Sequence, residues 1–258
     1  IPVPICSPAG RRLPAGVRHR PPEQYTRLRQ EDAARQARVP LPAAPVRDMG
    51  RRGASNAPGA APVRALVSGT KKMPCVLMKF PDQANTYTVA NFQNLLFTPK
   101  GVPTGSARDY FLENSYGQLT LDGACYGWFT TPQAKSYYGE TSSGGLGGVA
   151  CAYRAAQMAD AAEVDWAQFD NDGDGYVDCL WVVHSGRGAE ETGSGSDIWS
   201  HSSSFHYFTG NGMNEIITAT PDPHRPGQRI KIDYYIIMPE TSKYAGGNGS
   251  TVTINSIG

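Results

Sequence analysis

The acidic segment 170–178, with the sequence DNDGDGYVD, leads directly into an apolar run that ends at His184. The run 177–184 consists largely of Val, Leu and Trp, which is typical of a buried β-strand. Aspartates at alternate positions between glycines are instead typical of a tight polar turn. A chain that joins the two directly places a polar turn at the start of a buried strand.

The spacing of the aspartates matches the first part of a calcium-binding loop. Calcium takes roughly six to eight oxygen ligands, and a tight loop supplies them from alternate residues. The segment offers four carboxylates and one backbone carbonyl as ligands: Asp170, Asp172, Asp174, Tyr176 and Asp178. Trp181 occupies the twelfth position, where an EF-hand has a bidentate Glu. We therefore predict a structural calcium site between a helix and a strand, and not an EF-hand sensor.

An acidic surface turn without a metal is the alternative interpretation, because Asp and Gly are common in such turns. Carboxylates this close together repel one another unless a cation lies between them. We therefore favour bound calcium, and we expect even a weak site to be filled in an extracellular medium that contains calcium at about millimolar concentration.

Charge and proline divide the chain into two parts. Residues 1–72 contain 14 Lys and Arg against 4 Asp and Glu, with 11 of the 20 prolines, whereas residues 73–258 contain 10 Lys and Arg against 19 Asp and Glu. The first part has few large apolar side chains, so we predict a basic, Pro-rich tail or pro-region that is partly disordered, with a short helix at 23–38. It lacks interleaved aromatic residues, and we expect no nucleic-acid partner.

From residue 73 onward the sequence predicts an α+β domain with α/β-like alternation, in which helices flank a mixed sheet. Runs typical of strands are found at 73–82, 119–126 with an extension to 129, 177–184, 230–238 and 251–254. Helical patterns are found at 91–97, 106–117 and 149–164, and the Gly- and Ser-rich segment 185–197 is predicted to be a loop. The best-marked helix begins at Ser106 as N-cap, with Asp109 three residues later, and Gly117 can end it.

The histidines form no recognisable catalytic pattern. His201 and His206 are five residues apart with no Glu between them, so they do not match the zinc-binding helix His-Glu-x-x-His. We expect structural roles for the histidines and assign no catalytic residue. Glu190 and Glu191 either add calcium ligands or lie exposed in their loop. The chain contains no Gly-x-Ser-x-Gly elbow, P-loop or dinucleotide-binding fingerprint.

Five cysteines are widely spaced, without a Cys-x-x-Cys pair. Cys75 and Cys179 lie in apolar runs and are expected to be core thiols, whereas a bridge between Cys125 and Cys151 stays an open question. No apolar run is long enough to span a bilayer. The chain begins with Ile and shows no signal peptide, so we expect a processed or partial product, and its first residues do not indicate a location.

The run at 73–82, the helix SARDYFLENSYG at 106–117, the acidic loop with its strand at 169–186 and the sequence DIWSH at 197–201 follow one another in a distinctive order. In this order and spacing they resemble the immune inhibitor A family of secreted bacterial zinc metallopeptidases. The resemblance covers about residues 73–258. It implies a zincin-type N-terminal subdomain that forms the upper wall of a substrate cleft, protein or peptide substrates, and a secreted or extracellular location.

In that family the zinc-binding helix follows a segment like 251–258. The resemblance therefore implies that both helix histidines, the catalytic Glu and the third zinc ligand would lie beyond Gly258. The cofactors expected are calcium as a structural ion in this chain and zinc in the full-length parent. We expect the chain by itself to be inactive.

The sequence thus favours a chain that is part of a zinc-dependent endopeptidase. The full-length parent would hydrolyse peptide bonds through a metal-bound water. The alternative is a non-catalytic, calcium-dependent binding or adhesion module, for which the acidic loop would be enough. The residues encoded after Gly258 would discriminate between the two. The sequence does not indicate an oligomeric state.

Overall fold

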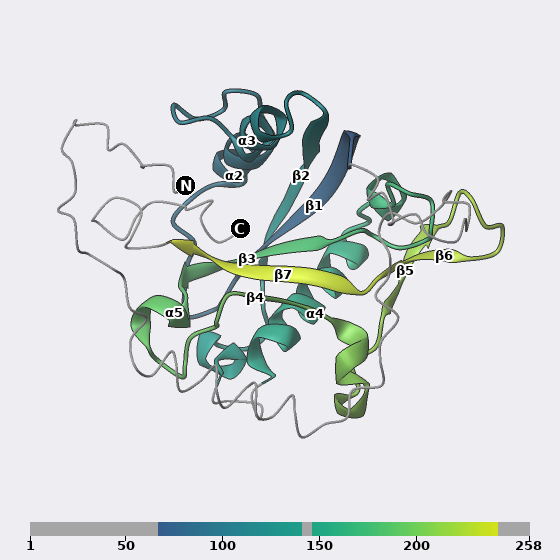
Figure 1. Ribbon diagram of the computed structural model, residues 1–258. Helices are drawn as coiled ribbons and strands as arrows, with labels where there is room; N and C mark the ends of the chain where they lie inside the picture. The colour runs from purple at the N-terminus through teal and green to yellow at the C-terminus, as the bar shows by residue number, and fades with distance from the viewer. Residues whose placement is uncertain (1–66, 141–145, 242–258) are drawn as a thin grey trace, which may run out of the picture. The chain divides into compact units, whose positions relative to one another are not determined.

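The computed structural model describes residues 67–140 and 146–241, all within the second of the two units into which the chain divides, Leu66–Gly258. Five strands form one sheet in the order β2-β1-β3-β7-β4 (Figure 1). Neighbouring strands are parallel except β4, which pairs antiparallel with β7 at the edge. Their bounds are Gly69–Lys79 for β1, Leu119–Thr130 for β2, Leu180–Arg187 for β3, His201–Ser204 for β4 and Tyr234–Thr241 for β7. The prediction of a mixed sheet with flanking helices is confirmed.

Alternate side chains of the central strands point to opposite faces of the sheet. On β1, Val76 and Met78 belong to one buried apolar cluster, whereas Cys75 and Leu77 belong to a second. All four side chains are completely shielded from solvent. A strand buried on both faces has a continuously apolar sequence, which is why this part of the chain shows no alternation of polar and apolar residues.

Helices cover both faces of the sheet (Figure 1). Helix α4 (Gly147–Ala161) packs on one face, and helices α2 (Val89–Leu96) and α3 (Ala107–Asn114) pack on the other. Alanine favours the helical conformation, and the face of α4 that packs on the sheet is lined with fully buried alanines: Ala152, Ala155, Ala156 and Ala159. Their short side chains allow the helix to lie close to the strands.

The N-terminus of α3 has the capping box that the sequence predicts. Ser106 Oγ accepts the backbone N–H of Asp109 at 3.2 Å, and Asp109 Oδ2 accepts the backbone N–H of Ser106 at 2.8 Å. Two N–H groups that a helix end leaves without partners are thus satisfied. The hydrogen bonds that the Asp109 carboxylate accepts from the backbone N–H groups of Ser106 and Lys100 lower its pKa. The helix ends at Asn114, earlier than predicted, and Gly117 follows with φ = 78°.

A second, two-stranded antiparallel sheet is formed by β5 (Ile216–Pro221) and β6 (Arg229–Ile232). The prediction of one strand at 230–238 is therefore wrong, because Asp233 separates β6 from β7. The Asp233 carbonyl accepts the N–H of Phe205 at 3.0 Å, and its Oδ1 accepts the N–H of His206 at 3.0 Å. The chain passes from one sheet to the other at this residue.

Other boundaries also differ from the predictions: β1 spans Gly69–Lys79 rather than 73–82, and α4 spans Gly147–Ala161 rather than 149–164. Strand β3 begins at Leu180 and not at Val177, because the Val177 N–H donates to the carbonyl of Lys231 in β6 at 2.9 Å. The predicted loop at 185–197 is wrong in part, since β3 continues to Arg187 and Ala189–Thr192 form helix α5. Ala189 is completely buried. The surrounding Gly and Ser residues favour a loop prediction and give no sign of this buried helix residue. Strands β4 and β5 have no counterpart among the predictions.

Three short 3₁₀ helices complete the described elements: η1 (Lys135–Tyr138), η3 (Trp166–Phe169) and η4 (Phe205–Asn211). Within the ranges that the structure describes, no helix is long and apolar enough to cross a membrane. The predicted tail up to residue 66, with its helix at 23–38, and the predicted strand at 251–254 lie outside the described residues.

Candidate calcium site

The acidic loop lies between η3 and β3, at the end of the sheet where the parallel strands begin. Asp170, Asp172 and Asp174 each offer a carboxylate oxygen, and the three oxygens lie within 4.8 Å of one another. Asp170 is buried and Asp172 is exposed, so the group reaches from the core to the solvent. Over residues 67–140 and 146–241, no other group of three or more His, Cys, Asp or Glu side chains is close enough to hold a metal ion.

Backbone N–H groups of the loop hold these carboxylates in place. The two oxygens of Asp170 accept from the N–H groups of Asp174 at 3.0 Å and Gly175 at 2.8 Å. Asp174 Oδ1 accepts from the N–H of Tyr176 at 2.9 Å. A carboxylate oxygen has a second lone pair and can contact a cation while it keeps such a hydrogen bond. A cation held by these three oxygens would be one that prefers oxygen ligands, and such ligands suit calcium better than zinc.

The other two predicted ligands have different surroundings. Asp178 Oδ2 accepts from the backbone N–H of Asn171 at 3.0 Å and from its side-chain Nδ2 at 2.6 Å, and Asp178 is not one of the three clustered carboxylates. The hydroxyl of Tyr176 donates to Glu215 at 2.6 Å. Ligation by Asp178 and by the carbonyl of Tyr176 stays a prediction.

The turn between β5 and β6 packs against the acidic loop. Arg225 Nη2 donates to the carbonyl of Gly173 at 3.2 Å, and Arg225 Nε forms an ion pair with Asp222 at 2.8 Å. Gly175 has φ = 81°, and a Cβ at this position would clash first with Arg225 Nη2 and would lie 2.8 Å from Asp222 Oδ2. Gly175 is therefore required both by its backbone conformation and by these contacts. Asp222 and Arg225 were not predicted, because they come much later in the chain and belong to no motif.

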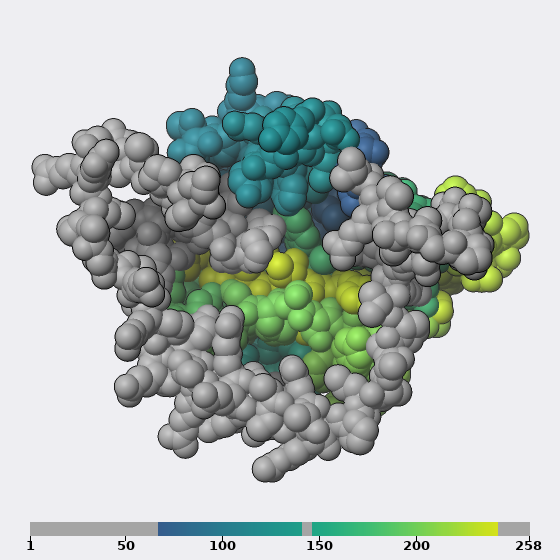
Figure 2. Space-filling view, in the orientation of Figure 1, coloured from purple at the N-terminus to yellow at the C-terminus, as the bar shows by residue number. Residues whose placement is uncertain are grey.

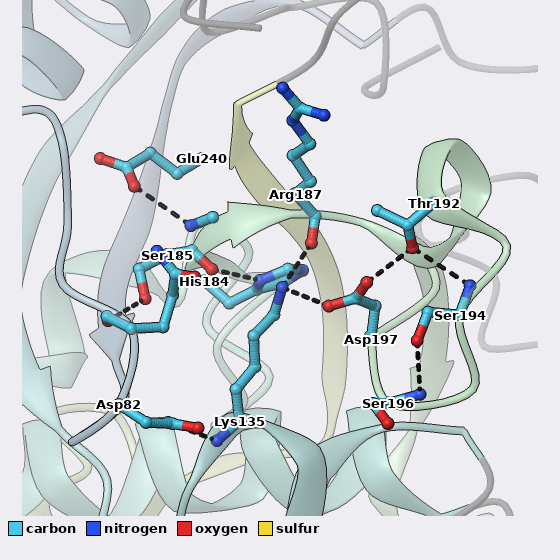
Figure 3. A network of polar contacts seen from close by, with 12 residues as sticks. Asp82, Lys135, His184, Ser185, Arg187, Thr192, Ser194, Ser196, Asp197 and Glu240 are labelled. Carbon is cyan, nitrogen blue, oxygen red and sulfur yellow. Dashed lines mark hydrogen bonds and ion pairs between the residues drawn. The ribbon is translucent and has the colours of Figure 1, made fainter.

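A second polar cluster lies at the opposite end of the sheet, where the parallel strands end (Figure 3). Lys135 Nζ donates to the carbonyl of Arg187 at 2.8 Å and forms an ion pair with Asp197 at 2.5 Å. Thr192 donates to the other oxygen of Asp197 at 2.6 Å. Burial opposes ionisation of Asp197, but the hydrogen bonds from Lys135 and Thr192 outweigh it and lower its pKa. The cluster connects η1, β3 and α5.

Glu240, near the end of β7, belongs to the same end of the sheet (Figure 3). Its side chain is completely buried. Oε1 accepts from the N–H groups of Thr86 and Tyr87, each at 2.6 Å, and Oε2 accepts from the N–H of Gly186 at 3.2 Å. This carboxylate holds the segment before α2 against the ends of β3 and β7.

Glu190, a possible additional calcium ligand in the sequence, also lies at this end, in α5. Its carboxylate accepts from the hydroxyl of Ser200 at 2.6 Å and from the Ser200 N–H at 3.2 Å. Since the acidic loop precedes β3 and α5 follows it, the length of the strand separates Glu190 from the clustered aspartates. Glu190 therefore does not belong to the group of carboxylates in the loop.

Residues 77–247 match the family model described as the immune inhibitor A peptidase M6, catalytic domain. The chain belongs to this family. The match begins near the end of β1 and extends beyond β7, so it includes β2, β3, β4 and β7 and the last three residues of β1. M6 peptidases are metallopeptidases, and the family assigns this domain to proteolysis of protein or peptide substrates. A comparison with curated proteins finds no match.

The described residues of this M6 domain do not offer a zinc site. His184 is completely buried in β3, and burial lowers its pKa to about 3. His201 and His206 are held by the hydroxyl of Tyr235 at 2.9 Å and the carboxylate of Asp233 at 2.6 Å. Zinc sites contain His or Cys ligands, with carboxylates in some of them, whereas the candidate metal group among the described residues contains carboxylates alone.

Proposed function

We propose that this chain is part of a secreted zinc-dependent endopeptidase and that its acidic loop binds calcium as a structural ion. The observation that carries the proposal is the match of residues 77–247 to the M6 catalytic domain. Calcium supports the stability of the domain in this proposal, and zinc supplies the hydrolytic chemistry when it is bound. No hydrolytic role is assigned to the described residues, because they offer no zinc site.

The edge strand β4 supports a role of this sheet in substrate binding. It pairs with β7 on one side, and no other described strand pairs with its outer side. The light-green and yellow parts of the chain, which include β4 and β7, reach the surface of the face shown in Figure 2. Unpaired N–H and C=O groups of an edge strand can bind an extended peptide. A peptide in that position would lie along one wall of a cleft, as the family resemblance implies.

The peptidase part of the proposal is tested with two proteins, the 258-residue chain and the product of its complete coding sequence. Each is incubated with zinc and a denatured protein substrate, with and without a chelator. We expect cleavage by the complete product only, and loss of that cleavage when zinc is removed. Turnover by the 258-residue chain would contradict its proposed inactivity. A complete product that binds ligands in a calcium-dependent way but cleaves nothing would favour a binding or adhesion module.

The calcium part of the proposal is tested by titration calorimetry of the 258-residue chain with calcium and with zinc. We expect calcium to bind at one site, and Asp172→Asn to weaken that binding at least tenfold because it removes one of three clustered charges. Glu163→Gln is the matched control, since it removes an exposed carboxylate outside the loop. Equal calcium affinities of the two variants would show that the loop does not hold the ion.

A further inference from the structure

Two cysteines face each other across the neighbouring strands β1 and β2. Cys75 and Cys125 are direct partners in the parallel register. Both pack in the apolar cluster beneath α2 and α3, so their side chains lie on the same face of the sheet. Neighbouring strands are about 4.8 Å apart, and disulfides join residues whose Cα atoms are about 4.4–6.8 Å apart. The register therefore places this pair within reach of a disulfide.

The surroundings of the two thiols differ in exposure. Cys75 is completely buried, whereas Cys125 is half-buried. The backbone N–H of Cys125 donates to Gln93 Oε1 of α2 at 3.0 Å, which fixes this part of β2 against the helix. A hydrogen bond with Cys125, followed by burial, raises the pKa of Cys75 well above its usual value. The two thiols thus interact directly, and Cys125 is the one that an external reagent reaches first.

The other described cysteines are less well placed as partners. Cys151 belongs to the cluster on the opposite face of the sheet, so it cannot bridge to Cys125 without crossing the sheet. Burial raises its pKa to about 12. Cys179 packs on the same face as Cys75, but it precedes Trp181, the residue of β3 that pairs with Cys75, by two positions. Among the described cysteines, only Cys125 lies directly opposite Cys75 in the strand register.

We propose that Cys75 and Cys125 are a redox-active pair that closes to a disulfide between β1 and β2 when the chain meets an external low-molecular-weight disulfide. The Cys125 thiol loses its proton and attacks one sulfur of the external disulfide, which releases one thiolate and leaves a mixed disulfide on Cys125. Cys75 then loses its proton and attacks the Cys125 sulfur, which releases the second thiolate. Two protein thiols are oxidised and one external disulfide is reduced to two thiols.

The bridge would link the two strands that flank the segment carrying α2 and α3. These helices form the cover of one face of the sheet. A cross-link between the ends of a long segment restricts the unfolded chain and so stabilises the folded state. The pair would make the stability of this half of the domain depend on the redox state of its surroundings.

The experiment uses the full 258-residue chain, incubated in native buffer with oxidised or with reduced glutathione. After alkylation of free thiols, peptide masses identify the linked cysteines. We expect a peptide pair joined through Cys75 and Cys125, lighter than its reduced form by two hydrogen atoms. We also expect the midpoint of thermal unfolding to rise by about 5 °C or more on oxidation and to return on reduction.

Two variants make the result specific. Cys125→Ala should abolish the linked peptides and the shift in midpoint, whereas Cys151→Ala, on the other face of the sheet, should retain both. The mass assignment in the unaltered chain does not depend on whether either variant folds. Alkylation of both Cys75 and Cys125 after oxidation, or a bridge that joins either of them to Cys179 or Cys6, would overturn the proposal.

Discussion

The side chain of Asn171 pairs with the backbone of Lys72, since its Oδ1 accepts the Lys72 N–H at 2.7 Å and its Nδ2 donates to the Lys72 carbonyl at 2.9 Å. Lys72 lies in the part of β1 that precedes its pairing with β3, which begins at Cys75. The Asn171 carboxamide thus makes the two hydrogen bonds to Lys72 that the backbone of a neighbouring strand would otherwise make. Because Asn171 also donates to Asp178, one side chain connects the acidic loop to the first half of β1.

Asn171→Ala should lower the free energy of unfolding by about 1 kcal/mol, because it removes hydrogen bonds to backbone groups that water can partly replace. Urea denaturation measures the change. Asn114→Ala is the matched control, since the amide of Asn114 makes a local hydrogen bond to Tyr110 at the exposed end of α3. If both variants lose the same stability, the contact with Lys72 does not strengthen the fold.

Calcium should raise the midpoint of thermal unfolding, because the ion binds the folded loop and screens the repulsion among Asp170, Asp172 and Asp174. At a free calcium concentration of about 100 times Kd, the shift should be about 5 °C or more. A chelator should reverse it. Equal midpoints with calcium and with chelator would argue against a structural ion.

Asp178→Asn should weaken calcium binding less than Asp172→Asn. The carboxylate of Asp178 lies outside the cluster of three. Calorimetric titration of both variants gives the comparison. A loss of affinity as large as that of Asp172→Asn would place Asp178 among the direct ligands.

Glu240→Gln should destabilise the domain by about 2–3 kcal/mol. The carboxylate is completely buried and accepts three backbone N–H groups, so an amide in its place would direct N–H against N–H. Denaturation in urea measures the loss. Glu113→Gln, an exposed change on α3, should shift the free energy of unfolding by less than about 0.5 kcal/mol. Similar values for the two variants would show that the Glu240 contacts are not stabilising.

His184 should make the domain less stable as the pH falls. Burial, and next the charge of Lys135, lower its folded-state pKa from 6.5 to about 3. Between these pH values the unfolded chain binds one proton more than the folded chain. The contribution of His184 to the free energy of unfolding is therefore complete above pH 6.5 and is lost toward pH 3. The resulting decrease in the free energy of unfolding is about 2 kcal/mol between pH 7 and pH 5.

His184→Phe should remove that part of the pH dependence, because Phe carries no titratable group. The neighbouring Phe80 ring can pack against the new side chain. Urea denaturation at pH 7, 6 and 5 compares this variant with the unaltered chain. His224→Gln, a change at an exposed histidine, should leave the dependence as it is. If His184→Phe retains the full pH dependence, other groups cause it.

Local signals in the sequence predicted those parts of the fold whose interactions are themselves local. The capping box of Ser106 and Asp109 fixes the start of α3, and the apolar run of β1 follows from burial on both faces of the sheet. The division between β6 and β7 was not predictable from a continuous apolar run. It depends on hydrogen bonds between Asp233 and η4, which approach each other only in the folded chain.

The same distinction applies to the acidic loop. Its three clustered aspartates follow from their spacing, since a tight turn brings alternate residues together. The contacts of Arg225 with Gly173 and of Asn171 with Lys72 join distant segments, and neither residue type is rare enough to suggest such a partner. Residues that fix the position of a loop are therefore harder to predict than residues within it.

The order of strands in the sheet has a consequence for synthesis on the ribosome. Strands β1, β2 and β3 can pair in the order in which they leave the exit tunnel, because each of the later two lies beside β1. The edge strand β4 emerges before β7, yet β7 is its partner in the sheet. The wall that we propose for the substrate cleft is thus completed only after translation has passed Thr241, and until then β4 is an unpaired nascent segment that a chaperone could hold.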